Sequence, residues 1–308
     1  MEIDGVFSGG GMKGLALVGA CKVFEENGYT FKNTVGTSAG AIVAAMIASG
    51  YSASEMEDVL MEQDFPALLD ARKTWFPVPF LKWIQLYWKM GLYKGVALEN
   101  WFSDLLAEKG VYTFADLPEG SLKIVVSDLT NGKLVILPDD LEEYGLRPDF
   151  FPVARALRMS TSIPFFFEPV PLHSLAGNAV TVDGGVLSNF PLWVFGEAEK
   201  PPARPVVGMK LTYEAGHKKE KSIRNGLTLY EALFSTMKDA HDQKHIPKHL
   251  EQDVLFIPTE GISAVQFALS DEEKQELLQS GTRSAEKYLK TATFTGRHPV
   301  LRHRRMTG

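Results

Sequence analysis

In the first fifty residues, stretches with the apolar pattern of a strand alternate with stretches that have the apolar spacing of a helix. A short, mostly apolar run at 3–7 is typical of a buried strand, and apolar residues with helical spacing then predict a helix at 15–27. The pattern repeats with a short strand at 34–36 and a helix of small residues at 39–49, closed by Gly50. Strands that alternate with helices favour a mostly parallel sheet.

The rest of the chain continues this alternation. Helical patterns lie at 54–63, 98–109, 151–159, 226–241 and 271–288, and strand-like runs lie at 123–128, 134–137, 179–182, 206–211 and 254–258. Asn131-Gly132 joins the first two of these strands and signals a hairpin turn. We find no internal repeat. The sequence therefore predicts a three-layer α/β fold, with helices flanking a mostly parallel central sheet.

Composition limits the class of protein. With 308 residues, of which 45% are apolar, the chain can form a substantial core. A formal net charge of -6 argues against a general nucleic-acid-binding protein. The sequence has no secretory signal and no apolar run of about 18 residues, so we expect a cytoplasmic protein without a transmembrane helix. The single cysteine, Cys21, fits a reducing compartment and a buried position on the first helix.

The candidate nucleophile is Ser38, in the pentapeptide Gly36-Thr37-Ser38-Ala39-Gly40. Glycines on both sides of a serine let the backbone turn sharply and let neighbouring elements approach closely. The hydroxyl then lies at the tip of the turn, where a substrate can reach it. Such turns of small residues are common, so the pentapeptide alone is a weak signal.

A glycine-rich loop follows the first strand at 8–14. Its backbone N–H groups at Gly10, Gly11 and Met12 are unobstructed, and the following helix directs its positive end towards them. Such a loop holds an anion, which is either a phosphate or the oxyanion formed when a serine attacks an ester. Lys13 is the one charged residue of the loop and is a candidate contact for a lipid phosphate. The alternative for Lys13 is a solvent-facing position in the first helical turn.

The candidate base is Asp183, which ends a short strand and begins the turn Asp183-Gly184-Gly185. A carboxylate in that place suits a general base, although aspartate often only caps such a turn. A Ser-His-Asp triad would instead need a histidine. His173, shortly before Asp183, is the best candidate for that role.

Together and in this order, these motifs resemble those of the patatin-like phospholipases. The resemblance rests on three segments, at 9–14, 36–40 and 183–185. Supporting matches lie at 92–95, 127–133, 156–170 and 182–191. It extends from about residue 3 to residue 192, and nothing in the last third of the chain is carried over from it. The glycines that support the motifs are Gly9, Gly14, Gly36, Gly40, Gly184 and Gly185.

The resemblance implies a patatin-like fold and a lipid acyl hydrolase with a Ser-Asp dyad. Ser38 would attack an acyl ester of a lipid, best represented by a glycerophospholipid, and Asp183 would take the proton directly. The N–H groups of Gly10 and Gly11, with Met12, would hold the oxyanion. Neither a metal nor another cofactor is required by this mechanism.

These inferences divide the chain into three parts. Residues 1–195 are expected to form the catalytic core with all the motifs, 196–296 to continue the same α/β domain, and 297–308 to form a basic, flexible tail. The expected partner is a lipid or phospholipid, with peripheral contact to a membrane surface. The stretch 64–93 contains Trp75, Trp83 and Trp88, and it suits a membrane contact, a lid or a buried subdomain.

Two other functions remain open. The glycine loop also fits the Gly-x-Gly-x-x-Gly pattern of nucleotide-binding proteins, but Glu25 and Glu26 lie within the first helix, whereas that pattern needs an acidic residue at a strand end. The second alternative is a non-catalytic lipid-binding or scaffold protein with the same fold. A metal site at His241, His245 and His249 is disfavoured, since a proline interrupts their helix.

Overall fold

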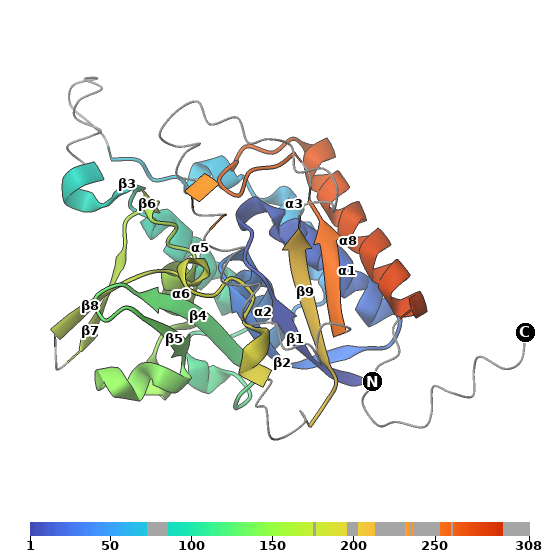
Figure 1. Cartoon of the computed structure of the whole chain (residues 1–308), viewed down its shortest axis with the longest axis horizontal. Helices are drawn as coiled ribbons and strands as arrows, with labels where there is room; N and C mark the ends of the chain where they lie inside the picture. The colour runs from blue at the N-terminus through green and yellow to red at the C-terminus, as the bar shows by residue number, and fades with distance from the viewer. Residues whose placement is uncertain are drawn as a thin grey trace, which may run out of the picture.

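The computed structural model describes residues 1–72, 86–174, 177–195, 203–212, 232–233, 236, 253–259 and 261–291. Its centre is an eight-stranded sheet in the order β10-β9-β1-β2-β4-β8-β7, with β5 paired to β4 (Figure 1). The parallel strands are β1 (Glu2–Phe7), β2 (Thr30–Thr37), β4 (Leu122–Asp128), β9 (Val206–Thr212) and β10 (Val254–Pro258). The antiparallel strands are β5 (Lys133–Leu137), β7 (Val170–Ser174) and β8 (Gly177–Asp183).

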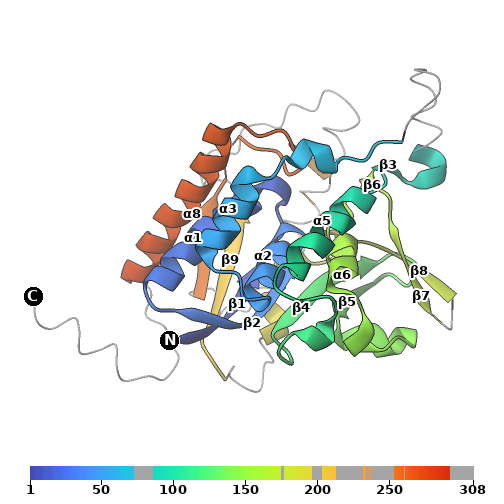
Figure 2. The same ribbon diagram turned by 180° about the vertical axis from the view of Figure 1, so that it is seen from behind.

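Six described helices pack together over one face of this sheet (Figure 2). They are α1 (Leu15–Glu26), α2 (Ala39–Ala48), α3 (Ala53–Glu62), α5 (Val96–Ala107), α6 (Val153–Ser160) and α8 (Asp271–Thr291). Two short strands, β3 (Gly91–Tyr93) and β6 (Phe165–Phe167), form a separate parallel pair. The fold prediction is confirmed: a mostly parallel central sheet is flanked by helices.

The central strands are apolar on both faces because both faces are buried. Along β1, Phe7 enters the large core beneath the helices, whereas its neighbour Val6 enters a smaller cluster on the opposite face. In β4, Ile124 and Val125 divide in the same way. Such two-sided burial explains why these strands are continuous apolar runs with little alternation.

Strands β9 and β10 and helix α8 join the last third of the chain to the first. Helix α8 packs directly against α1, and the two backbones approach closely at one glycine on each helix. A Cβ atom at Gly281 would clash with the carbonyl oxygen of Ala16, and one at Gly19 would clash with that of Leu278. Cys21 is fully buried on α1, and burial raises the pKa of its thiol. This favours the expected apolar role over a reactive one.

Most predicted elements lie where the sequence placed them, but three strands were missed. β3, β6 and β7 are short or rich in proline and aromatic residues, so their strand pattern is weak. Pro171 is tolerated in β7 because β7 forms the edge of the sheet. The predicted helix at 226–241 falls largely outside the described residues, and the three spaced histidines and the basic tail fall wholly outside them. None of the helices within the described ranges combines the length and the apolar character needed to cross a bilayer.

Replacing Gly281 with alanine should destabilise the protein. The added Cβ meets backbone that cannot move aside, so the clash should exceed alanine's helix propensity and cost about 1–3 kcal/mol net. Thermal unfolding should show a melting temperature several degrees lower. The control is Gln275→Ala on the exposed side of α8, which should stay within about 0.5 kcal/mol of the parent. Equal melting temperatures for the two variants would contradict the close packing of α1 and α8.

Candidate active site

Ser38 occupies the sharp turn between β2 and α2. Its φ of 53° and ψ of -123° lie in a region that side-chain-bearing residues rarely adopt. The flanking glycines are sterically required, because a Cβ at Gly36 would meet the carbonyl of Gly40, and one at Gly40 would meet the carbonyl of Phe7. The motif therefore produces the turn that the sequence predicted.

Asp183 ends β8 and accepts a hydrogen bond from this serine. Ser38 Oγ lies 2.6 Å from Asp183 Oδ2, and both side chains are buried. The other carboxylate oxygen, Oδ1, accepts the N–H of Gly185 at 2.7 Å. Gly184 packs against the carbonyl of Val125, where a side chain would not fit. The glycine turn thus orients the carboxylate so that one oxygen faces Ser38.

His173 lies elsewhere. It is an exposed residue of the β7–β8 hairpin, and its Nδ1 is 2.8 Å from Asn178 Oδ1. Asn178 precedes Asp183 by five residues on one strand, which corresponds to about 16 Å. The geometry therefore favours the two-residue arrangement over a triad with His173.

The C-terminal end of α6 and the residues just after it hold both Ser38 and Asp183 in position. The strained N–H of Ser38 donates to Ser160 Oγ at 2.9 Å, and that hydroxyl donates to the carbonyl of Val125 at 2.7 Å. Two residues further on, the carbonyl of Ser162 accepts the N–H of Asp183 at 2.8 Å. One short segment thus contacts Ser38 on one side and Asp183 on the other.

A buried arginine fixes this segment in turn. Arg158 donates to Ser162 Oγ and to the backbone carbonyls of Lys94 (2.7 Å), Gly95 (2.8 Å) and Glu168 (2.8 Å). Burial lowers the pKa of its guanidinium to about 10. Sequence reasoning assigned no role to Arg158, Ser160 or Ser162. Their only signal was membership of the 156–170 segment that supports the resemblance.

The glycine loop packs under a segment from the far end of the chain. Met12 N–H donates to the carbonyl of Ala264 at 3.3 Å, and Gly11, with φ at 59°, leaves no room for a Cβ beside that carbonyl. Within the described part of the chain, the N–H groups of Gly10 and Gly11 donate no hydrogen bond. In this they differ from the N–H group of Met12.

The remaining residues of the loop have structural contacts. Gly9 N–H donates to the carbonyl of Asn189 at 3.0 Å, and Gly14 packs against Ala39. Lys13 is only 6% exposed, so it is not the solvent-facing lysine of the alternative considered above. Its side chain is also not among those that line the pocket described next.

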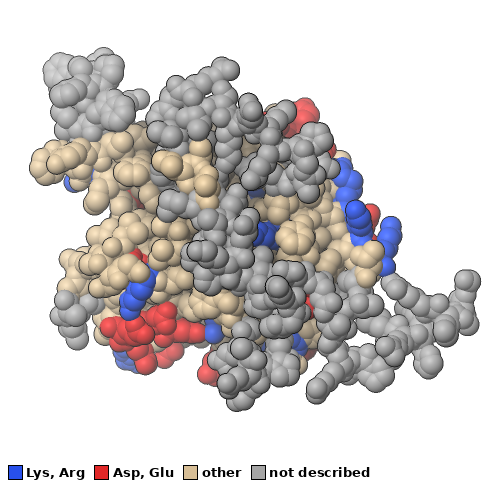
Figure 3. Space-filling view, in the orientation of Figure 1, with Lys and Arg blue, Asp and Glu red and all other residues tan. Residues whose placement is uncertain are grey.

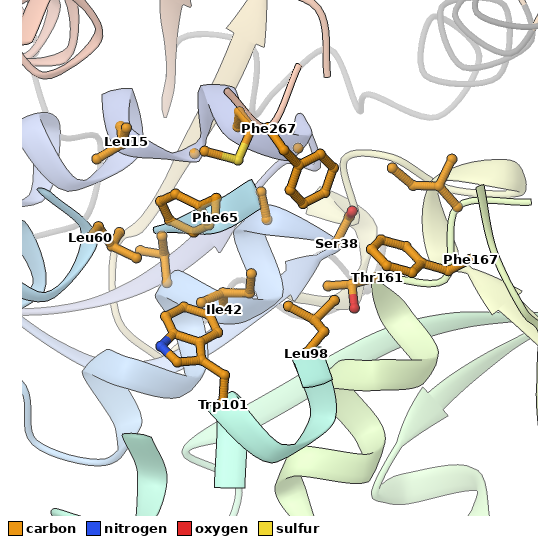
Figure 4. A pocket seen from close by; sticks show the side chains of 16 residues that line it. Leu15, Ser38, Ile42, Leu60, Phe65, Leu98, Trp101, Thr161, Phe167 and Phe267 are labelled. Carbon is orange, nitrogen blue, oxygen red and sulfur yellow. The ribbon is translucent and has the colours of Figure 1, made fainter. Parts of the chain in front are cut away.

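A narrow apolar pocket opens beside Ser38 (Figure 4). Its cavity volume is about 70 Å³. Among the described lining residues, the only hydroxyl groups are those of Ser38 and Thr161, and the others are Gly11, Met12, Gly14, Leu15, Ala39, Ile42, Val43, Leu60, Phe65, Leu98, Trp101, Ile163, Phe167 and Phe267. Phe267 stacks on Phe166 with ring centroids 5.3 Å apart. The sequence did not predict a place for Phe267 in the site, because the resemblance ends at about residue 192, before Phe267.

Exposed apolar residues gather in and just before the strand pair β3–β6. Tyr87 (78% exposed), Trp88 (72%), Met90 (48%) and Phe165 (53%) form what we call the aromatic rim, after its three aromatic members. Phe165 pairs with Gly91 in the β3–β6 sheet, whose other end carries the pocket residue Phe167. Residues 73–85, with Trp75 and Trp83, lie outside the described part of the chain.

Comparison with known proteins gives consistent results. A family model described as patatin-like phospholipase matches residues 5–195. YqhO of Bacillus subtilis is 51% identical over 294 residues, which cover 96% of this chain and 100% of that protein. The cUMP-AMP-activated phospholipase of Escherichia coli is 26% identical over 194 residues, covering 59% of this chain and 54% of that protein. The solved structure of VipD from Legionella pneumophila aligns with a TM-score of 0.52 at 16% identity, covering 95% and 67%; this likeness shows the fold.

Replacing Ser160 with alanine should slow ester hydrolysis while leaving substrate binding intact. The variant leaves the Ser38 N–H without its acceptor, which should cost about 1–3 kcal/mol and lower kcat about tenfold to a hundredfold, with KM little changed. Steady-state kinetics on a short-chain p-nitrophenyl ester measure both parameters, and Ser160→Thr should restore part of kcat.

The matched control is Ser121→Ala. Ser121 is also a buried serine, but its hydroxyl has no hydrogen-bond partner in the described structure, so its loss should be neutral. If Ser160→Ala retained the parent kcat, or lost activity only in proportion to lost folded protein, Ser160 would not position the nucleophile.

Proposed function

The chain belongs to the patatin-like phospholipase family, and from this premise we propose that it is a lipid acyl hydrolase with Ser38 as nucleophile and Asp183 as base. The observation that carries the proposal is the 2.6 Å contact between Ser38 Oγ and Asp183 Oδ2 at the edge of an apolar pocket. Hydrolysis of lipid esters is the activity of the family. The phospholipase named among the relatives supports the same chemistry here.

The reaction proceeds in two halves. Asp183 accepts the proton of Ser38 as the serine oxygen attacks the acyl carbonyl, and the N–H groups of Gly10 and Gly11 stabilise the oxyanion. Collapse of this intermediate expels the alcohol, which takes the proton from Asp183, and leaves the acyl group on Ser38. Asp183 then removes a proton from water, which attacks the acyl-enzyme. The fatty acid departs, and the proton returns to Ser38.

Two features support this assignment of roles. Ser38 lies at the N-terminus of α2, where the helix dipole favours the negative charge that develops on the reacting atoms. The engagement of Met12 by Ala264 leaves Gly10 and Gly11 as the proposed donors. Contact between Lys13 and a lipid phosphate stays a prediction, and the burial of Lys13 is equally compatible with support of the loop.

The rival functions make different demands on the same site. A nucleotide-binding protein would need polar groups for a base and sugar, whereas the pocket beside the glycine loop has an almost wholly apolar lining. A non-catalytic lipid-binding protein would use the pocket but would not form a covalent bond at Ser38. Covalent labelling therefore separates hydrolysis from both.

A fluorophosphonate probe should label Ser38, and Ser38→Ala should abolish both labelling and ester hydrolysis. Loss of a nucleophile lowers kcat by several orders of magnitude. Asp183→Asn should be nearly as inactive, since an amide cannot accept the proton, whereas His173→Ala should keep most of the activity. Peptide mapping by mass spectrometry identifies the labelled residue, and p-nitrophenyl ester kinetics measure the rest.

Circular dichroism spectra of the three variants serve as the folding control. If the His173→Ala variant were folded but inactive, the site would contain a triad with His173 and not a dyad. Labelling at a residue other than Ser38, with turnover preserved in Ser38→Ala, would overturn the proposed nucleophile.

We also propose that the aromatic rim contacts the surface of aggregated lipid. Tryptophan and tyrosine gain most where one side of the ring is apolar and the other is wet. Strand β3, which directly follows Met90 of the rim, lies at the upper left in Figure 1, whereas acidic side chains gather at the lower left of the same view in Figure 3, over the 3-10 helix Asp139–Tyr144. On this face, the acidic cluster that an anionic bilayer would repel is therefore separated from β3.

Trp88→Ala combined with Tyr87→Ala should weaken binding to phospholipid vesicles and lower activity on them several-fold. Turnover of a monomeric short-chain ester should change little, because neither residue lines the pocket. Vesicle sedimentation and paired assays on the two substrates test this. A lower melting temperature together with equal losses on both substrates would indicate a structural role for these residues instead.

A further inference from the structure

The apolar pocket has two distinct ends. Figure 4 shows Ser38, Thr161 and Phe167 on one side of it and Leu60, Phe65 and Trp101 on the other, with Ile42 and Leu98 between them. Ile42 lies one turn along α2 from Ser38, which corresponds to about 6 Å. A chain attached to Ser38 that enters the pocket therefore passes Ile42 before it reaches Leu60, Phe65 and Trp101, which form what we call the far wall.

Phe65 and Trp101, the aromatic residues of the far wall, are fixed by contacts with their neighbours. The rings of Phe65 and Trp101 meet edge to face, with centroids 6.0 Å apart, and Trp101 also packs on Phe102, which is fully buried. Lys274 of α8 donates to the carbonyls of Met61 (2.7 Å) and Gln63 (3.3 Å), and its ammonium group lies 5.7 Å from the centre of the Phe65 ring. The wall is thus tied to α8 and to the buried core.

We propose that this pocket takes a single acyl chain and that Trp101 and Phe65 set the longest chain it accommodates. The inference rests on the proposed function and adds a substrate preference to it. None of the described residues that line the pocket is charged, so the hydrocarbon part of the substrate, and not its headgroup, occupies this space. The small cavity volume of about 70 Å³ supports occupancy by one chain rather than two.

Acyl-chain burial makes this preference measurable. Each methylene that moves from water into an apolar pocket improves transition-state binding by a factor of about four. For the wild-type protein, kcat/KM on p-nitrophenyl esters below their critical micelle concentrations should therefore rise with acyl length and then stop rising or fall. The length at which the trend breaks reports where the chain meets the wall.

Trp101→Ala should move this break to chains longer by about two to four carbons, because the indole it removes occupies the space of several methylenes. Phe65→Leu provides a milder second variant in case Trp101→Ala folds poorly. Ile42→Trp should act in the opposite direction, since it fills the middle of the pocket: short esters should still react, while turnover of longer ones falls at least tenfold. Tyr112→Ala is the control, an exposed aromatic residue outside the pocket, and its length profile should match that of the wild type.

The outcomes separate the two proposals. Wild-type protein that hydrolyses no ester and takes no fluorophosphonate label refutes the hydrolase assignment itself. Active protein whose profile is unchanged in folded Trp101→Ala, Phe65→Leu and Ile42→Trp variants refutes the length limit and leaves the hydrolase intact. Shifts of opposite sign for Trp101→Ala and Ile42→Trp support it.

Discussion

The contact between Ser38 and Asp183 depends on the strand that separates their two strands. β4 lies between β2 and β8, parallel to one and antiparallel to the other. Thr37, just before Ser38, is opposite Val125, and Asp183 is opposite Val126. The backbones of β2 and β8 are two strand spacings of about 4.8 Å apart. The side chains of Ser38 and Asp183 therefore meet only because the turns that carry them face each other. The register on β4 therefore determines whether the two side chains can meet.

The strained backbone of Ser38 persists because its surroundings restrain it from several directions. Glycines at 36 and 40 remove every side chain that would prevent the close approach, and Ser160 satisfies the N–H that the turn exposes. Ser160 in turn donates to Val125, the same β4 residue whose carbonyl packs against Gly184. Such strain costs of order 1–3 kcal/mol and is retained only where surrounding contacts enforce it. Here those contacts converge on one residue of the central sheet.

The parts of the site that could be predicted from the sequence are those made by local chain geometry. Ser38, the glycine loop and Asp183 each lie in a turn whose conformation a few adjacent residues determine, so short motifs located them. Arg158 and Ser160 act through contacts with distant backbone, and an arginine or serine near a helix end carries no local signal of such a role. Phe267 was beyond prediction for the same reason: its place in the pocket depends on how β10 and α8 join the sheet. Strand order likewise depends on non-local pairing, although the alternation of elements was sufficient to predict the α/β class.

The carbonyl of Ala264, which packs against Gly11 and binds Met12, also affects the order in which the protein matures. During synthesis the N-terminal strands, the serine and the aspartate leave the ribosome first, while the segment that braces the glycine loop emerges more than eighty residues after Asp183. A chain interrupted between these points carries Ser38 and Asp183 but not the brace. The nascent polypeptide consequently completes the contacts of its glycine loop only after Ala264 has left the ribosome, and chains that stop earlier lack this brace.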